Sequence, residues 1–183
     1  MQKIRKANCF IITGGPGMGK TTLIEELSRA GYTCVSETGR KIIKHEIEAG
    51  GTALPWMNKF AFADKMLSLS VNDFTKVTEM LIPVFFDRGI PDVAGYMELS
   101  GMAISEETMN TVRKYNYNSK VFITPPWEEI YKHDTERRQT FDEAIETYRM
   151  MTKIYSALGY ELIELPKTPV RQRMVFVLEN INA

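Results

Sequence analysis

Short apolar runs alternate with amphipathic stretches along this 183-residue chain. The runs have the length and composition of β-strands that are buried on both faces of a parallel sheet. We predict five such strands, at residues 8–13, 32–36, 81–86, 120–124 and 160–165.

The stretches between the strands repeat apolar residues every three or four positions, which is typical of helices with one buried face. We predict helices at residues 23–30, 36–49, 58–79, 91–100, 105–114, 141–158 and from 169 onward. We expect Ile42, Ile43 and Ile47 on the inner face of the second helix. In the third helix, we expect Phe60 to be the first residue of the inner face. The alternation indicates an α/β fold, a parallel sheet with right-handed crossovers and helices on both faces.

A glycine-rich turn connects the first predicted strand to the first helix. Gly14, Gly19, Lys20 and Thr21 match the P-loop spacing G-x-x-x-x-G-K-[ST]. Such a loop points its N–H groups at a phosphate, and the helix N-terminus adds its positive dipole end. Lys20 is expected to reach the β- and γ-phosphates of a nucleotide, and the Thr21 hydroxyl to ligate Mg²⁺. The expected phosphate-binding residues are Gly14, Gly15, Pro16, Gly17, Met18, Gly19, Lys20, Thr21 and Thr22.

Charged residues follow the third strand, where a parallel sheet places its ligands. Asp87 fits a Walker B position, which would hold Mg²⁺ opposite Thr21. Arg88 follows it and could clamp an acceptor or a transferred phosphate. The alternative role of Arg88 is a structural ion pair with Glu37 or Asp87.

A carboxylate, Glu37, ends the second strand, and Arg40 lies one helical turn further on. Glu37 could accept a hydrogen bond from an acceptor hydroxyl and act as a general base. It could equally be a carboxylate that stabilises the N-terminus of the helix. The residues leave both roles open.

The densest polar cluster lies between the fourth strand and the long helix and contains His133, Asp134, Arg137 and Arg138. Arginines on a lid could stabilise the charge of a transferring phosphoryl group once the site closes. We place this lid around residues 127–140, within a single domain that spans residues 1–183. A solvated helix face is the alternative for such a charge run.

Two further features bear on ligands. Trp56 and Phe60 could stack on the ring of an acceptor, although such residues more often belong to a core. Pro166 and Lys167 follow the fifth strand and could contact the nucleotide base. The Asn-Lys-x-Asp motif that recognises guanine is absent, so the choice between ATP and GTP stays open.

Composition narrows the functional classes by exclusion. The chain has 23 basic and 23 acidic residues, which gives no support for a nucleic-acid partner. Cys9 and Cys34 lie in apolar runs, as buried free thiols of a reducing compartment do, and no metal-ligand spacing is present. The longest apolar runs are far too short to span a membrane, and no signal peptide is apparent. We therefore expect a cytoplasmic protein.

Taken together, these motifs resemble the small AAA-type P-loop domains that include the kinase domain of the NadR regulator. The motifs that carry the resemblance are Phe10 to Gly17, the Glu37/Arg40 pair, Leu54 to Trp56, Phe85 to Gly89, Pro125 to Glu128 and Asp134 to Phe141. The resemblance implies a three-layer nucleoside- or nucleotide-kinase-like fold with strand order 2-3-1-4-5, which binds ATP or GTP and Mg²⁺. It does not name an acceptor.

We therefore interpret the chain as a P-loop phosphotransferase that acts on an unidentified small molecule of nucleoside or related type. The residues expected to carry the chemistry are Lys20, Glu37, Asp87, Arg88, Arg137 and Arg138, with Thr21 and Asp87 at the metal. The alternative is a slow NTPase or a nucleotide-dependent switch without a small-molecule acceptor. The oligomeric state stays open.

Overall fold

The fold is built on a five-stranded parallel sheet with β2 (Cys9–Gly14) at its centre. The computed structural model describes residues 2–78, 82–131 and 140–181. The strands lie in the order β3 (Thr33–Val35), β4 (Val84–Asp87), β2, β6 (Lys120–Thr124), β7 (Glu161–Glu164). Numbered along the chain, these five strands have the order 2-3-1-4-5, so the predicted topology is confirmed.

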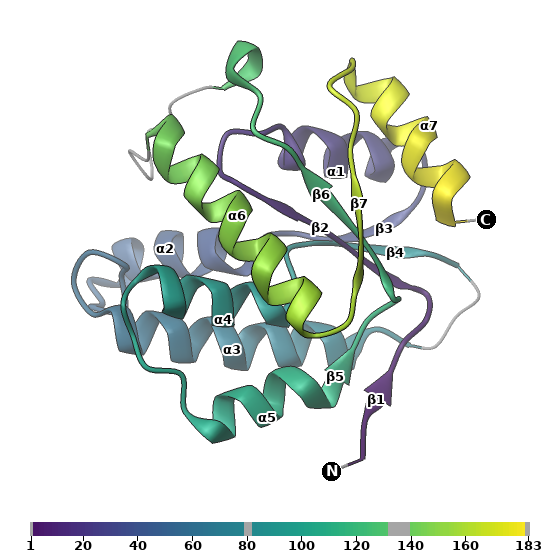
Figure 1. The fold of residues 1–183 in the computed structure, drawn as a ribbon. Helices are drawn as coiled ribbons and strands as arrows, with labels where there is room; N and C mark the ends of the chain where they lie inside the picture. Colours follow the sequence, from purple (N-terminus) through teal and green to yellow (C-terminus); the bar gives the residue numbers. More distant parts are fainter. Residues whose placement is uncertain (1, 79–81, 132–139, 182–183) are drawn as a thin grey trace.

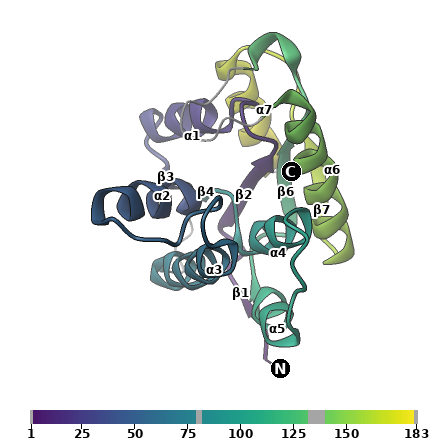
Figure 2. The ribbon, with the colours of Figure 1, turned by 90° about the vertical axis from the view of Figure 1, so that its left-hand side faces the viewer.

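Helices cover both faces of the sheet and give the predicted three layers (Figures 1 and 2). One face packs against α1 (Lys20–Arg29) and α7 (Val170–Ile181). The other packs against α3 (Lys59–Lys76), α4 (Ile90–Leu99), α5 (Glu106–Lys114) and α6 (Phe141–Ala157). Helix α2 (Thr38–Ala49) packs on α3 rather than on the sheet.

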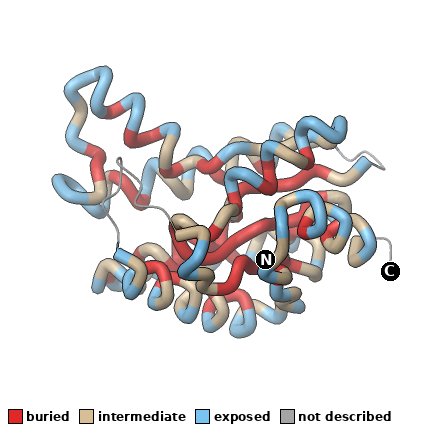
Figure 3. The backbone as a smooth tube through the Cα atoms, turned by 90° about the horizontal axis from the view of Figure 1, so that it is seen from above, coloured by how far each residue is buried: buried red, intermediate tan, exposed pale blue. Residues whose placement is uncertain are grey.

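The central strand β2 is buried along its whole length (Figure 3). Because successive side chains of a strand point to opposite faces, Phe10 and Ile12 pack toward α1 and α7, whereas Ile11 packs toward α4 and α6. None of the helices in the described ranges is long and apolar enough to cross a lipid bilayer.

In two of the predicted helices, one residue expected on the buried face is exposed instead. Ile47 is 61% exposed, because the inner face of α2 is centred on Ile42, Ile43 and the buried carboxylate of Glu46. Glu46 accepts a hydrogen bond from the Ala53 amide (2.8 Å) and pairs with Lys65. Phe60 is 66% exposed, because α3 begins at Lys59 and turns Phe62 and Ala63 inward instead.

Two element boundaries also differ from the prediction. Strand β4 begins at Val84 rather than at residue 81, after Pro83, which has no N–H to donate to a neighbouring strand. Helix α3 ends at Lys76 rather than at residue 79. Its last carbonyls accept hydrogen bonds from the buried Lys6 ammonium, at 2.7 Å for Phe74 and 3.2 Å for Thr75. A cation at the C-terminus of a helix also stabilises the negative end of its dipole.

Three short elements were not predicted. Strands β1 (Ile4–Arg5) and β5 (Tyr115–Asn116) pair in parallel as a separate two-stranded sheet. A 3₁₀ helix, η1 (Glu128–Ile130), follows β6. Elements of two or three residues are too short to show a hydrophobic period.

Candidate active site

The glycine-rich turn adopts backbone angles that side chains disfavour. Gly14, Gly17 and Gly19 have φ values of 125°, 71° and 75°, and Gly19 caps the N-terminus of α1. A Cβ atom on Gly14 would lie 2.3 Å from the Thr124 hydroxyl oxygen. A Cβ on Gly15 would lie 2.3 Å from the Ala144 carbonyl oxygen. The turn is therefore a tight loop between β2 and α1, with the geometry that phosphate-binding loops need.

Lys20 lies within this turn. It is buried, and its ammonium donates a hydrogen bond to the Gly15 carbonyl at 2.5 Å. The positive charge is thus held inside the loop rather than in solvent. This is the place from which it can reach a bound phosphate.

Asp87 and Thr21 meet at the end of β4, as the sequence predicts. The Thr21 hydroxyl donates to Asp87 Oδ2 at 3.5 Å, while no described residue donates to the buried Oδ1 atom. Burial, and then the neighbouring Glu37 carboxylate, raise the pKa of Asp87 from 3.8 to about 6. An under-bonded carboxylate beside a hydroxyl is a suitable place for a divalent cation.

The described residues contain no group of three or more His, Cys, Asp or Glu side chains that could hold a metal by themselves. Mg²⁺ does not require such a group. It is usually bound by one or two protein oxygens, together with substrate phosphates and water. Thr21 and Asp87 fit that pattern.

Arg88 joins the elements of the site. Its Nε atom donates to Glu37 Oε1 and its Nη1 atom to Asp92 Oδ1, both at 3.1 Å. Burial alone would lower the pKa of Arg88, but the Glu37 and Asp92 carboxylates outweigh it and raise that pKa. The ion pair with Glu37, allowed by the sequence as a structural role, is thus present.

The backbone of Arg88 is strained. Its φ of 72° is the only positive value among the described non-glycine residues. Long side chains rarely adopt this left-handed conformation, and such outliers cluster at functional sites. The Arg88 amide donates to the Ile12 carbonyl at 3.0 Å, which ties the strained residue to the central strand.

Asp92 is a site residue that the sequence analysis missed. Its Oδ1 atom accepts hydrogen bonds from Thr13 (2.6 Å) and Arg88, and its Oδ2 atom from Tyr155 (2.5 Å) and the Gly89 amide (2.8 Å). It lies in the first turn of α4, three residues after the N-cap Gly89. An acidic residue at that position is a capping signal that could have identified it.

Glu37 is buried at the N-cap of α2, but its side chain makes no capping hydrogen bond. Its Oε2 atom instead pairs with Arg40 Nε at 3.3 Å, and its Oε1 atom with Arg88. Glu37 also lines the cavity described next. The carboxylate is thus held by two arginines at the edge of a pocket.

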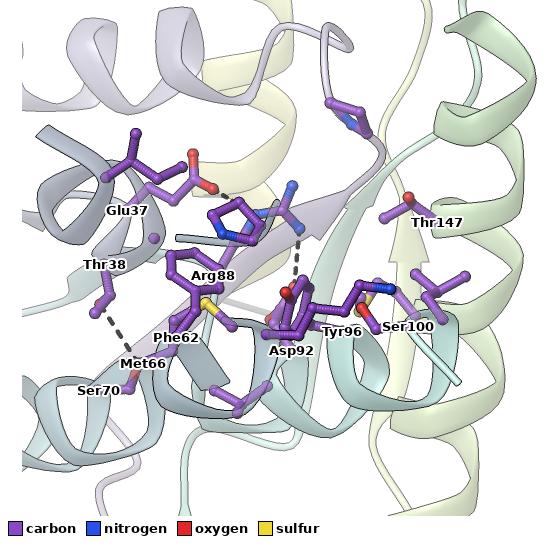
Figure 4. Close-up of a pocket in the computed structure, with 18 of the residues that line it drawn as sticks. Glu37, Thr38, Phe62, Met66, Ser70, Arg88, Asp92, Tyr96, Ser100 and Thr147 are labelled. Atoms are coloured by element: carbon purple, nitrogen blue, oxygen red, sulfur yellow. Dashed lines mark hydrogen bonds and ion pairs between the residues drawn. The ribbon is translucent and has the colours of Figure 1, made fainter. Parts of the chain in front are cut away.

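A cavity of about 470 Å³ lies beside the glycine-rich turn, between α2, α3, α4 and α6 (Figure 4). This volume is within the usual range for small-molecule sites. Its lining includes Pro16 of the loop and the Glu37, Arg88 and Asp92 side chains. Trp56 lines the cavity and is exposed, whereas Phe60 is exposed and does not line it.

Arg173 is a second residue that the sequence analysis missed. Only 5% of it is exposed, its Nη1 atom lies 3.4 Å from the Gly19 carbonyl, and its guanidinium lies over the Trp127 ring. Burial lowers its pKa. Within the described ranges, its Nε atom has no hydrogen-bond partner.

The predicted lid residues His133, Asp134, Arg137 and Arg138 lie outside the described residues, so their role stays a prediction. The described segments on either side both adjoin the glycine-rich turn. A Cβ on Gly19 would lie 3.2 Å from Ile130 Cδ1, and α6 approaches Gly15 through Ala144.

A sequence model of the protein family described as AAA domain matches residues 9–173. No curated protein matches the chain significantly.

Solved structures with a similar fold include several small kinases. Deoxyadenosine kinase from M. mycoides aligns with a TM-score of 0.67 and 14% identity over 95% of this chain and 98% of that one. A NadR protein in complex with NR aligns with a TM-score of 0.74 and 16% identity over 97% of this chain and 52% of that one. Shikimate kinase from Acinetobacter baumannii aligns with a TM-score of 0.60 and 15% identity over 95% of this chain and 92% of that one. At these identities, the likeness shows the fold.

Proposed function

We propose that this chain, which belongs to the AAA domain family over residues 9–173, is a phosphotransferase. It would transfer phosphate from ATP or GTP to a small-molecule hydroxyl. The observation that carries the proposal is the cavity that adjoins the P-loop at Pro16 and has Glu37 and Arg88 in its wall. A nucleotide-dependent switch, the alternative function, needs no such second pocket. The transferase is therefore favoured.

The donor nucleotide would bind on Gly14 to Thr22. The loop amides and the start of α1 would hold its phosphates, and the buried ammonium of Lys20 would leave the Gly15 carbonyl for the β- and γ-phosphates. The left-handed glycines allow the tight turn that would aim the loop amides at the phosphates.

Thr21 and Asp87 would hold Mg²⁺, since the Asp87 Oδ1 atom accepts no hydrogen bond from the described residues. When bound, Mg²⁺ neutralises charge on the phosphate oxygens. Because the pKa of Asp87 is about 6, the carboxylate is ionised at neutral pH and becomes protonated in mild acid.

On the acceptor side, Glu37 would accept the proton of the attacking hydroxyl as general base. Arg88 would fix the orientation of Glu37 through their 3.1 Å ion pair. Positioning of this kind is most of what phosphoryl transfer requires, since the reaction needs little covalent chemistry from the protein.

Arg137 and Arg138 would stabilise the charge of the transferring phosphoryl group from a lid between η1 and α6. The support is that Ile130 and Ala144, which flank residues 132–139, both adjoin the P-loop. A lid anchored at those two places could close over the donor phosphates.

The test is a phosphate-transfer screen with ATP and GTP over nucleosides, nucleoside monophosphates and small hydroxy acids, with mass spectrometry of the products. We expect a phosphorylated acceptor, with loss of transfer in Glu37→Gln and loss of nucleotide binding in Lys20→Ala. Hydrolysis as the only reaction, unchanged in Glu37→Gln, would favour the switch and contradict the transferase.

A further inference from the structure

The carboxylate of Asp92 is the centre of a buried hydrogen-bond network. Its Oδ1 atom accepts from the Thr13 hydroxyl at 2.6 Å and from Arg88 Nη1 at 3.1 Å. Its Oδ2 atom accepts from the Tyr155 hydroxyl at 2.5 Å and from the Gly89 amide at 2.8 Å. An ionised carboxylate has about four lone-pair sites, and the protein itself fills all four. Asp92 is therefore fixed in position rather than open to a ligand.

The donors to Asp92 come from three different segments. Thr13 belongs to β2 and directly precedes Gly14, the first residue of the glycine-rich turn. Arg88 and Gly89 form the turn after β4. Tyr155 belongs to α6. Hydrogen bonds to a buried charged group are short and strong, so this carboxylate holds the three segments in register with one another.

Arg88 carries the position of Asp92 on to Glu37. One end of its guanidinium binds Asp92 through Nη1 and the other binds Glu37 through Nε, both at 3.1 Å (Figure 4). The guanidinium is planar and rigid, so a displacement at one end moves the other end too. The placement of the Glu37 carboxylate at the cavity thus depends on the donors that hold Asp92.

Helix α6 reaches the glycine-rich turn as well as this network. A Cβ atom on Gly15 would lie 2.3 Å from the Ala144 carbonyl oxygen, near the start of the helix. Tyr155 lies roughly 16 Å further along the helix axis, and a Cβ on Gly89 would lie 3.2 Å from its hydroxyl oxygen. One helix therefore packs closely against both the glycine-rich turn and the turn that carries Arg88.

We propose that Thr13 and Tyr155 are positioning residues, which act through Asp92 and Arg88 to place Glu37 relative to the P-loop; this inference rests on the proposed phosphotransferase function. Both side chains are buried, and neither lines the cavity. Their loss therefore leaves the donor contacts intact and misaligns the acceptor side. Misplacement by about 1 Å costs roughly a hundredfold in rate.

The first test removes one hydroxyl group from α6. We expect Tyr155→Phe to lower kcat for transfer at least about tenfold, with less than about threefold change in the Kd for ATP. Tyr117→Phe is the matched control, because Tyr117 is also buried and its hydroxyl accepts from the Ile90 amide (3.3 Å) instead. That variant should keep kcat within about threefold. Equal losses of kcat in the two variants, assayed where both are folded, would overturn the proposal.

The second test uses a conservative rescue at Thr13. Thr13→Val keeps the shape of the side chain and removes the hydroxyl, whereas Thr13→Ser keeps the hydroxyl. We expect Thr13→Val to lose kcat as Tyr155→Phe does, and Thr13→Ser to stay within about threefold of the parent protein. A loss of packing alone would affect Thr13→Ser at least as much as Thr13→Val, and that result would contradict the proposal.

Hydrogen exchange tests the network without any acceptor. A non-hydrolysable ATP analogue with Mg²⁺ should slow amide exchange at residues 88–92, and Tyr155→Phe should weaken this slowing while Tyr117→Phe preserves it. Equal slowing in both variants would overturn the inference and leave the phosphotransferase intact. Weakened slowing in Tyr155→Phe, with nucleotide hydrolysis as the only reaction, would support the link through Asp92 and overturn the proposed transfer instead.

Discussion

At the residue scale, Arg88 combines features that would be costly in a purely structural role. It has a left-handed backbone, and its guanidinium lies between two buried carboxylates. Strain of this kind persists only where the surrounding structure enforces it, as it does at many active sites. The ion pairs of Arg88 thus hold Glu37 and Asp92 in place beside the cavity.

Replacing Arg88 should therefore lower the free energy of unfolding strongly. Arg88→Met leaves Glu37 and Asp92 without their shared cation, and we expect a loss of about 3–5 kcal/mol in the free energy of unfolding. The matched control is Arg29→Met, because Arg29 is exposed and, among the residues that the structure describes, pairs with Glu25 and Glu26 on the surface of α1. That variant should change stability by about 0.5 kcal/mol or less. Equal losses in urea unfolding would contradict the assignment.

Replacing Asp87, in contrast to Arg88, should increase the free energy of unfolding. Its folded pKa of about 6 exceeds the ordinary 3.8, so the folded state holds this proton more tightly than the unfolded state does. The stabilisation is complete below pH 4 and is lost as the pH rises to about 6. Asp87→Asn should therefore stabilise the ligand-free protein at pH 7.5, by on the order of 1–3 kcal/mol, and the gain should vanish near pH 4.

Urea unfolding at the two pH values, without Mg²⁺ or nucleotide, measures this effect. Asp64→Asn, on the exposed side of α3, is the control and should change little at either pH. The same Asp87→Asn variant should lose the Mg²⁺ dependence of nucleotide binding. Destabilisation at pH 7.5 would mean that the carboxylate has structural partners instead.

At the element scale, the long strands and helices could be predicted because their patterns are physically simple. Parallel strands that are buried on both faces give continuous apolar runs, such as Phe10 to Ile12. Ile47 and Phe60 could not be placed, because their exposure depends on how Glu46 and Phe62 pack against other elements. Strands β1 and β5 are too short to leave a pattern.

The site was predictable to a similar extent. Lys20, Thr21, Glu37, Asp87 and Arg88 all lie at carboxyl ends of strands, or at the helix starts that follow them, so the topology brings them together. Asp92 and Arg173 come from inside α4 and α7. The packing of those helices brings both residues to the site. The capping position of Asp92 is a local signal for that residue, whereas no local motif marks Arg173.

The proposed lid belongs to the same scale, because it would be a segment rather than a single side chain. We expect Arg137→Ala and Arg138→Ala to lower kcat by at least about a hundredfold, with less than about threefold change in nucleotide affinity. Arg149→Ala, on the exposed side of α6, is the control. Steady-state kinetics measures the loss in kcat, and a nucleotide titration measures the change in affinity. Equal losses in both would indicate that the arginines bind the nucleotide in the ground state instead.

At the scale of the whole molecule, the sheet topology places the P-loop and the cavity side by side, as the proposed transfer requires. Strand β2 lies between β4 and β6, and the P-loop follows it at the carboxyl edge of the sheet. Asp87 and Arg88 end β4 at that same edge, and the cavity extends from there under α2, α3 and α4. In the proposed function, one side of the P-loop would face the donor phosphates, and the other would face an acceptor in the cavity.

The most direct test of this account is a crystal structure with Mg²⁺, a non-hydrolysable ATP analogue and a nucleoside. We predict that the terminal phosphates lie on Gly14 to Thr22 and that the nucleoside occupies the cavity. Its hydroxyl should lie within hydrogen-bond distance of Glu37 and point at the terminal phosphate. A nucleoside bound elsewhere, or a cavity that stays empty at saturating nucleoside, would contradict the account.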